Sequence, residues 1–373
     1  MCPPEESRQT QRTLAYGPTA ITLRSDDRAA LDWLAEFLGP WFTPSTRSAD
    51  WQVTLSSAAQ RYDAIAARRP ADAAPRACFA LDQQLVALPA WPESGAIAIA
   101  DPERSCFLVV EPFRVGLFGD VATRRWRFTL QWVCHEIAAT RLRRTALDLH
   151  AAAVESDGAA ILIVGPKGAG KTTLAFQLLR SGRCRWITND RAFAGRSASG
   201  CDVRGMPTPV KILAPTLRRF PELRRGLRPL ERPYLHQLGE ILGADRDETD
   251  RPAEVEFALS PAQVAHQLHV QAIDAAPLGA IVFPEIRADV AGYALERLDP
   301  PVVGAKLWGN LYGTASARSE PTLFEEIEGG LRAPQRELAD GLAGSVPGYR
   351  IVLGRAAYDA PDLVARVLET VRR

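Results

Sequence analysis

The sequence lacks several features that would assign the chain to a special class. No uninterrupted apolar run approaches the roughly 18 residues of a transmembrane helix. The stretch Met1–Thr13 is polar, so we expect no secretory signal. None of the six cysteines belongs to a C-x-x-C pair, which argues against a zinc site and against a disulfide framework. These absences predict a cytoplasmic protein with free thiols and no membrane partner.

The sequence also lacks an excess of charge of one sign. Its 45 basic residues balance 44 acidic ones, so the net charge is +1 and gives no global attraction to nucleic acid. A hydrophobic content of 46% and a charged content of 24% are ordinary for a globular protein. We therefore expect an α/β (α+β) chain that binds no nucleic acid and that, at 373 residues, is long enough for two domains.

Residues 1–144 are predicted to form an N-terminal accessory or substrate-recognition domain rich in antiparallel strands. Short β-rich runs, punctuated by Pro, Gly and Asp, fill residues 51–118. Amphipathic helices are predicted over residues 27–37 and 121–143. The second helix and its end carry arginines that we expect to form a solvated face, namely Arg124, Arg125, Arg127, Arg141, Arg143 and Arg144.

Residues 145–373 are predicted to form a nucleotide-binding core, because they contain a complete G-x-x-x-x-G-K-[ST] phosphate loop, the Walker A motif. A strand-like run, Ala159–Val164, precedes the loop, and Thr173–Arg180 follows it with helical spacing. Lys171 would neutralise the β- and γ-phosphate oxygens of ATP, and Thr172 would bind Mg²⁺. The predicted cofactor-binding residues are Gly165, Pro166, Lys167, Gly168, Ala169, Gly170, Lys171, Thr172 and Thr173.

Two further positions are candidates for the same site. If residues 147–154 and Ala159–Val164 pair as a hairpin, His150 projects near the phosphate end of the sheet; otherwise it is a core histidine. Asp190 follows the predicted strand Arg185–Thr188. A carboxylate at such a strand end beside a phosphate loop holds Mg²⁺ directly or through water. The alternative is an aspartate that opens a turn.

Together, Leu149-His150-Ala-Ala-Ala-Val, the phosphate loop and Thr188-Asn-Asp-Arg191 resemble the catalytic domain of the HPr kinase/phosphorylase family. They resemble more closely its HPr-kinase-like relatives in gene clusters for modified peptides, such as lasso peptides. The resemblance covers about residues 145–209. It implies a mixed-sheet core similar to that of phosphoenolpyruvate carboxykinase. It also implies that His150 contacts the transferred phosphate and that Thr172 and Asp190 hold Mg²⁺.

The resemblance aligns the family's two consecutive aspartates with Asn189 and Asp190, and the first aspartate is the family's expected general base. An amide cannot take a proton at neutral pH, so the implied catalytic set of His150, Lys171, Asn189 and Asp190 departs from the pattern. Either His150 or Glu285 replaces the base, or Asn189 only positions the acceptor, or phosphoryl transfer has been lost.

The predicted function is an ATP- and Mg²⁺-dependent kinase that transfers the γ-phosphate to a hydroxyl, with serine favoured, of a peptide or protein. The alternatives are a kinase for a small hydroxylated molecule and a nucleotide-binding module without transfer. Self-association is left open. Arg218–Arg232 is either a substrate surface or lid, or a solvated surface. Lys306–Gly313 is either a base-binding or substrate loop, or a buried turn.

Overall fold

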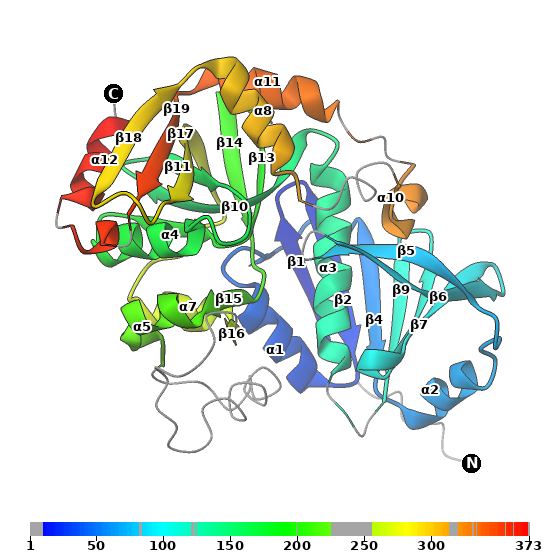
Figure 1. The fold of residues 1–373 in the computed structure, drawn as a ribbon. Helices are drawn as coiled ribbons and strands as arrows, with labels where there is room; N and C mark the ends of the chain where they lie inside the picture. The colour runs from blue at the N-terminus through cyan, green and yellow to red at the C-terminus, as the bar shows by residue number, and fades with distance from the viewer. Residues whose placement is uncertain are drawn as a thin grey trace, which may run out of the picture. The chain divides into compact units, whose positions relative to one another are not determined.

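The chain is a mixed α/β protein with two large mixed sheets in its described part (Figure 1). It divides into two compact units: the first comprises Met1–Arg144 and Gly313–Leu331, the second Thr145–Tyr312 and Arg332–Arg373. None of the described helices combines the length and apolar content needed to cross a membrane. The computed structural model describes residues 10–371 apart from 82–83, 121–122, 124, 199, 225–255, 313–319, 330–331, 333, 355 and 361.

The first unit is built on a nine-stranded sheet with the order β3-β1-β2-β4-β9-β8-β7-β6-β5. Its strands are β1 (Thr10–Tyr16), β2 (Thr19–Ser25), β3 (Thr43–Pro44), β4 (Trp51–Ser56), β5 (Ala74–Leu81), β6 (Gln84–Glu93), β7 (Ala96–Asp101), β8 (Cys106–Glu111) and β9 (Arg114–Gly119). Its described helices include α1 (Arg28–Leu38), α2 (Ala59–Ala66), α3 (Trp126–Leu142) and α10 (Leu323–Ile327), with a short 3₁₀ turn at Pro102–Arg104.

The predicted antiparallel region is a mixed sheet. Strand β4 pairs in parallel with β2 on one side and with β9 on the other, whereas the remaining neighbours are antiparallel. The parallel pairing of β2 and β4 follows from α1, because a helical crossover returns the chain to the sheet in the same direction. The predicted helix over residues 27–37 is α1, and Asp27 caps it by accepting a hydrogen bond from the Ala30 N–H.

The six arginines predicted to form a solvated face do not all do so: Arg125 and Arg144 are exposed, but two others are buried, and Arg124 lies outside the described residues. Arg127 and Arg143 are only 5% and 4% exposed. Arg143 donates to Glu136 at 2.6 Å and to Glu325 at 3.3 Å. The helical pattern could not predict this burial, because Glu325 belongs to a segment far along the chain.

That segment also corrects the predicted domain division. Residues 145–373 were expected to form one core, whereas Gly313–Leu331 belongs to the first unit. The carboxylate of Glu328 accepts hydrogen bonds from the Trp51 indole at 2.7 Å and from Arg141 at 3.0 Å. These charge-assisted contacts tie the returning segment to β4 and α3.

The second unit contains an eight-stranded sheet ordered β11-β10-β13-β14-β17-β19-β18, with β12 on β10 and an extra pairing of β11 with β17. The strands are β10 (Ala146–Ser156), β11 (Ala159–Val164), β12 (Arg185–Thr188), β13 (Arg191–Ser197), β14 (Gly200–Met206), β17 (Ala275–Ile286), β18 (Tyr293–Leu298) and β19 (Gly348–Leu353). A separate pair is β15 (Val210–Leu213) and β16 (Glu256–Leu259). The described helices include α4 (Lys171–Arg180), α5 (Ala214–Arg219), α7 (Pro261–Gln267), α8 (Pro300–Gly309), α11 (Gln335–Ser345) and α12 (Leu363–Val371), with 3₁₀ turns at Pro221–Arg224 and Ala357–Asp359.

The core of the second unit lies on one face of β10 and β11. Alternate residues such as Leu147, Leu149 and Leu162 join a buried cluster that also takes in Val303 of α8 and Leu342 of α11. Because side chains alternate along a strand, the even-numbered residues of β10 project to the opposite face. That alternation places polar side chains of a largely apolar strand beside the phosphate loop.

Candidate functional site

The predicted hairpin is present and brings His150 to the phosphate loop. Strands β10 and β11 pair antiparallel, with Ala151 opposite Val164. His150, the residue before Ala151, therefore lies level with Gly165, the first residue of the phosphate loop. The His150 side chain is 10% exposed. The hairpin on which its position at the loop depends is confirmed, while the burial of His150 and its contact with Asp190 also fit a core histidine.

The phosphate loop connects β11 to α4. Gly168 and Gly170 adopt positive φ angles of 83° and 96°, a left-handed conformation that favours glycine. A side chain at Gly170 would also collide with Tyr358, since a Cβ there would lie 2.4 Å from the Tyr358 hydroxyl. Residues 166–168 form the exposed crest of the loop, and α4 begins at Lys171. The backbone geometry thus favours glycine at both Gly168 and Gly170.

Lys171 folds back onto its own loop. Its Nζ donates to the carbonyl oxygens of Gly165 at 2.7 Å and Pro166 at 3.1 Å. The residue is 6% exposed. Burial lowers the pKa of Lys171 to about 8, although the negative charge of Asp190 opposes the shift. The amine is held by two neutral carbonyl oxygens of the loop. A phosphate anion is a stronger acceptor for a charged amine and would replace them.

His150 and Asp190 form a close pair. The His150 Nε2 lies 3.2 Å from the Asp190 Oδ1, and the Asp190 side chain is 28% exposed. Burial raises the pKa of Asp190, but the hydrogen bond and charge of His150 and the charges of Lys171 and Lys211 outweigh it. The pKa of Asp190 therefore lies below its usual range. Asp190 is therefore an ionised carboxylate that faces His150 and the charges of two lysines.

Asn189 lies beside this pair with its side chain buried. The residue is 6% exposed, and its Oδ1 has no hydrogen-bond partner among the described residues. The preceding Thr188 fixes the turn, because its hydroxyl donates to the carbonyl oxygens of Arg191 at 3.0 Å and Met206 at 3.1 Å. A buried acceptor without a donor is costly, and each one requires an explanation.

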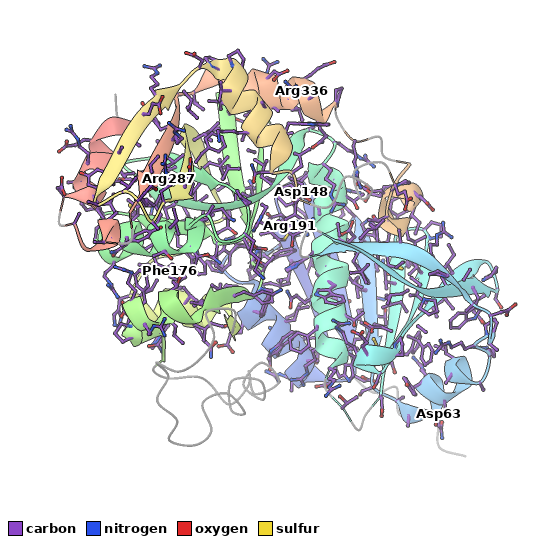
Figure 2. The ribbon with its side chains drawn as sticks, viewed as in Figure 1. Asp63, Asp148, Phe176, Arg191, Arg287 and Arg336 are labelled. Atoms are coloured by element: carbon purple, nitrogen blue, oxygen red, sulfur yellow. The ribbon has the colours of Figure 1, made fainter. Side chains whose placement is uncertain are left out.

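A buried ion pair between Arg191 and Asp148 lies next to the candidate site in the β10–β13 pairing. Arg191 donates to Asp148 through Nε at 3.0 Å and Nη2 at 2.7 Å (Figure 2). The guanidinium carbon lies 4.4 Å from the centre of the Tyr312 ring. Arg191 is opposite His150 in the β10–β13 register and adjoins Asp190 in sequence. The bidentate pair therefore fixes the backbone that carries both candidate residues.

The segment after α8 fixes the other edge of β10. His150 N–H donates to the Asn310 carbonyl at 3.0 Å, and Tyr312 N–H donates to the Asp148 carbonyl at 2.7 Å. Lys306–Gly313 was predicted to be a loop for a base or substrate, or a buried turn. Its described part is the end of α8 followed by this backbone pairing, with Tyr312 buried. Gly313 lies outside the described residues.

Other predicted positions have contacts of their own. Thr172 is half-buried at the start of α4, and the Thr173 hydroxyl lies 2.9 Å from that of Thr216 on α5. Glu285, a candidate base, is 46% exposed on its side chain and lies 3.9 Å from Arg350. In the arginine-rich stretch 218–232, residues 225–232 lie outside the described residues.

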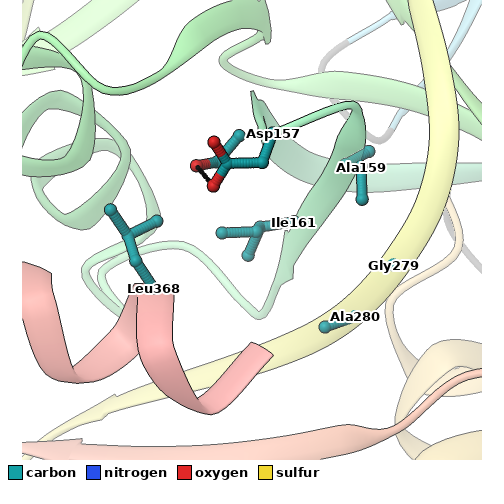
Figure 3. Close-up of a pocket in the computed structure, with 8 residues that line it drawn as sticks. Asp157, Ala159, Ile161, Gly279, Ala280 and Leu368 are labelled. Atoms are coloured by element: carbon teal, nitrogen blue, oxygen red, sulfur yellow. Dashed lines mark hydrogen bonds between the residues drawn. The ribbon is translucent and has the colours of Figure 1, made fainter. Parts of the chain in front are cut away.

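A separate cavity of about 240 Å³ lies at the opposite end of β11 from the phosphate loop (Figure 3). Small apolar residues of β11 and β17, together with Leu368 of α12, form most of its wall. Asp157 is the carboxylate among its lining residues. None of the predicted site residues lines this cavity.

Sequence reasoning missed the second flank of the phosphate loop. Ile286 ends β17 and is 47% exposed, and the Tyr358 hydroxyl donates to the Gly170 carbonyl at 3.3 Å. Lys211 of β15, whose charge acts on Asp190, was also missed. The Phe-Pro-Glu-Ile end of the predicted strand was the available signal for Ile286, but the parallel pairing of β11 with β17 was not visible in the sequence.

No family model matches the chain, and no curated protein matches it. Its function is therefore inferred from the chemistry of the site itself. A glycine-containing loop at a helix N-terminus, together with a lysine, can bind a phosphate chain, and a histidine beside a carboxylate can accept a proton next to it.

Proposed function

We propose that the chain is an HPr-kinase-like kinase that binds ATP with Mg²⁺ and transfers the γ-phosphate to a hydroxyl of a peptide or protein. The observation that carries the proposal is the His150–Asp190 pair, 3.2 Å apart, at the strand end that opens the phosphate loop. Phosphorylation of a hydroxyl needs a phosphate cradle and a nearby proton acceptor, and these two features lie together here.

Magnesium fits the donor set of this site. Thr172 offers a hydroxyl and Asp190 a carboxylate whose lowered pKa keeps it ionised at neutral pH, and both are oxygen donors that a hard cation prefers. Within the described residues, no three His, Cys, Asp or Glu side chains gather as a metal-binding group. The other ligands would then be phosphate oxygens and water, as is usual for Mg²⁺ beside a nucleotide. Bound there, Mg²⁺ would offset negative charge on the phosphates.

The chain's own residues would divide the remaining work. Lys171 exchanges its contacts with the Gly165 and Pro166 carbonyls for the phosphate oxygens. The acceptor oxygen attacks the γ-phosphorus as the bond from that phosphorus to the β–γ bridging oxygen breaks, so that ADP leaves. The hydroxyl proton passes to His150, and the Asp190 carboxylate, 3.2 Å from the His150 Nε2, stabilises the charge that forms. Asn189 orients the acceptor without taking its proton.

The test is transfer from γ-labelled ATP in the presence of Mg²⁺ to a panel of serine-containing peptides and small hydroxylated molecules. We expect label on peptides, and we expect Asp190→Asn to lose the Mg²⁺-dependent part of the ATP affinity, because an amide is a poor ligand for Mg²⁺. Asp340→Asn, on the exposed side of α11, is the matched control and should behave as the parent. Parental transfer by Asp190→Asn would contradict the proposed role of Asp190.

A second candidate function is a nucleotide-binding module without transfer. The observation that favours it is Asn189, which stands where the resemblance expects a carboxylate and whose Oδ1 is buried without a partner. Mg²⁺-dependent ATP binding with no labelled acceptor in the whole panel would select this candidate. Label on small molecules alone would instead select a small-molecule kinase.

A further inference from the structure

Three strands of the second unit run parallel and end at the same edge of the sheet (Figure 1). Ala160–Ile163 of β11 pairs in parallel with β17, and Ile281–Ile286 of β17 pairs in parallel with β19. The phosphate loop follows β11, while Ile286 and Tyr358 lie at or just beyond the ends of β17 and β19. Ligands of α/β proteins bind outside the carboxyl ends of parallel strands, so this edge extends the phosphate-binding region.

The phosphate loop has two chemically different flanks. On the β10 side lies the polar pair His150–Asp190. On the β17 side the neighbours are Ile286 and Tyr358, both within van der Waals reach of a side chain placed at Gly170. If the γ-phosphate points to the polar flank, where an acceptor can reach it, the nucleoside must extend away from that flank. The apolar flank is then the side available to the base.

Ile286 has the properties of a base-contacting residue. It is one of three large hydrophobic side chains that are exposed in the described part of the chain, with Phe113 and Val302. A Cβ at Gly170 would lie 3.2 Å from the Ile286 Cδ1, so the side chain rests on the phosphate loop although nearly half of it faces solvent. An aliphatic surface there gains by being covered with a flat aromatic base.

Tyr358 and Arg219 hold this flank in place. The Tyr358 hydroxyl bonds the Gly170 carbonyl, and the Arg219 guanidinium carbon lies 5.2 Å from the centre of the Tyr358 ring. Arg219 ends α5, which is tied to α4 because Arg180 donates to the Arg219 carbonyl at 2.9 Å. The flank is therefore built from elements anchored to the helix that follows the phosphate loop.

We propose that Ile286, backed by Tyr358 and Arg219, is the nucleoside subsite and that the base of the bound nucleotide packs on Ile286. This inference rests on the proposed function, because it assumes that the loop takes the phosphates. Beyond the proposed function, the subsite identifies the Ile286 side of the phosphate loop as the part that distinguishes a nucleotide from a bare phosphate chain. Polar selection among bases is a separate property that Ile286 does not supply.

The experiment compares calorimetric binding of ATP and of inorganic tripolyphosphate, each with Mg²⁺, to the full chain and two variants. Ile286→Ser should weaken ATP about fivefold or more, since roughly a kcal/mol of apolar contact is lost, and should leave tripolyphosphate within about twofold. Val302→Ser is the matched control, because Val302 of α8 is 43% exposed and Ile286 is 47% exposed. It should change neither affinity.

The outcomes separate the two levels of inference. If wild-type protein binds tripolyphosphate but Ile286→Ser leaves ATP affinity unchanged, the nucleoside subsite is wrong and the proposed function stands. If Ile286→Ser weakens both ligands equally, the residue shapes the phosphate loop, and the subsite is again wrong. If wild-type protein binds neither ligand, the proposed function falls and the subsite falls with it.

Discussion

Each unit contains buried charged side chains, and the Glu328 carboxylate of the first unit and the candidate site of the second are paired to different degrees. In the first unit, the Glu328 carboxylate is 2% exposed and faces three donors: the Trp51 indole at 2.7 Å, Arg141 at 3.0 Å and Arg144 at 2.9 Å. Each donor meets the carboxylate at a short distance. This is the pattern of a network that holds a segment of chain in place.

The candidate site in the second unit is under-satisfied by comparison. The Lys171 amine has two carbonyl oxygens instead of a carboxylate, and the Asn189 Oδ1 has no partner among the described residues. Asp190 carries one negative charge beside His150 and near the positive charges of Lys171 and Lys211. We therefore expect the Glu328 network to matter for stability and the candidate site to matter for ligand binding.

The largest expected effect comes from breaking a second buried network of the first unit, in which Arg143 pairs with Glu136 and Glu325. Arg143→Met would leave Glu136 and Glu325 buried without their shared cation, which typically costs about 3–5 kcal/mol. Urea denaturation should show a loss of that size while ATP affinity is retained. Arg350→Met is the control, since its exposed pair with Glu296 should be worth under about 1 kcal/mol. Equal losses in the two variants would contradict the comparison.

The next effect concerns the proton acceptor of the site. His150→Ala should lower phosphotransfer at saturating ATP by at least about a hundredfold, roughly 2.7 kcal/mol, because general base catalysis contributes on that scale. ATP affinity, measured by calorimetry, should change by no more than about threefold, since the phosphate loop is intact. His266→Ala, on the exposed side of α7, is the matched control. Full transfer by the His150→Ala protein would make His150 a structural histidine.

Lys171 should make the nucleotide-free protein less stable at neutral pH. Its pKa falls from 10.5 to about 8 on folding, which corresponds to about 3 kcal/mol, and its two hydrogen bonds return part of that cost. We expect Lys171→Met to raise the free energy of unfolding by about 1–2 kcal/mol below pH 8. ATP affinity should fall about ten- to a hundredfold.

The pH dependence gives this prediction its sign. Between pH 8 and 10.5 the unfolded chain holds the Lys171 proton more tightly than the folded chain, so the Lys171 contribution to stability becomes more favourable as pH rises. The difference between Lys171→Met and the parent should therefore shrink from pH 7 to pH 10. Urea midpoints at both pH values measure it. A constant difference would mean that the lysine is not buried as a charge.

The sequence predicted the parts of the site that are local in the chain. The hairpin of β10 and β11 follows from two apolar runs and a Ser156-Asp157-Gly158 turn, and it alone is enough to place His150 at the phosphate loop. Asp190 was predicted from its position at a strand end. Both predictions needed one turn and one register, which residue pattern specifies well.

The features that the sequence did not predict depend on pairings between segments that are distant in the chain. Ile286 lies at the loop only because β17 pairs in parallel with β11. The burial of Arg143 depends on Glu325, which lies in the segment Gly313–Leu331 that interrupts the sequence of the second unit. Periodicity shows that a residue faces a partner or solvent within one element, but it does not identify which distant segment supplies the partner.

The smallest expected effect sharpens the comparison at Asn189. Asn189→Asp places a second carboxylate beside Asp190, at a position that is 6% exposed. Burial and the negative neighbour raise the pKa of such a group, while the nearby cations limit the rise. Its folded pKa then exceeds its unfolded value of about 3.9, so the variant matches the parent at low pH and loses stability as pH rises. At pH 7 we expect a loss of about 1 kcal/mol.

Urea denaturation at pH 4 and pH 7 measures this loss, and adding ATP with Mg²⁺ should reverse it, because the cation compensates the extra charge. The same variant separates the two proposed functions. A working kinase should transfer phosphate faster once the carboxylate is restored, whereas a binding module should gain at most ATP hydrolysis. If Asn189→Asp is as stable as the parent at both pH values and no more active, the Asn189 side chain does not contact the bound nucleotide or acceptor. The contrast between the Glu328 network and the candidate site would then lose its clearest example.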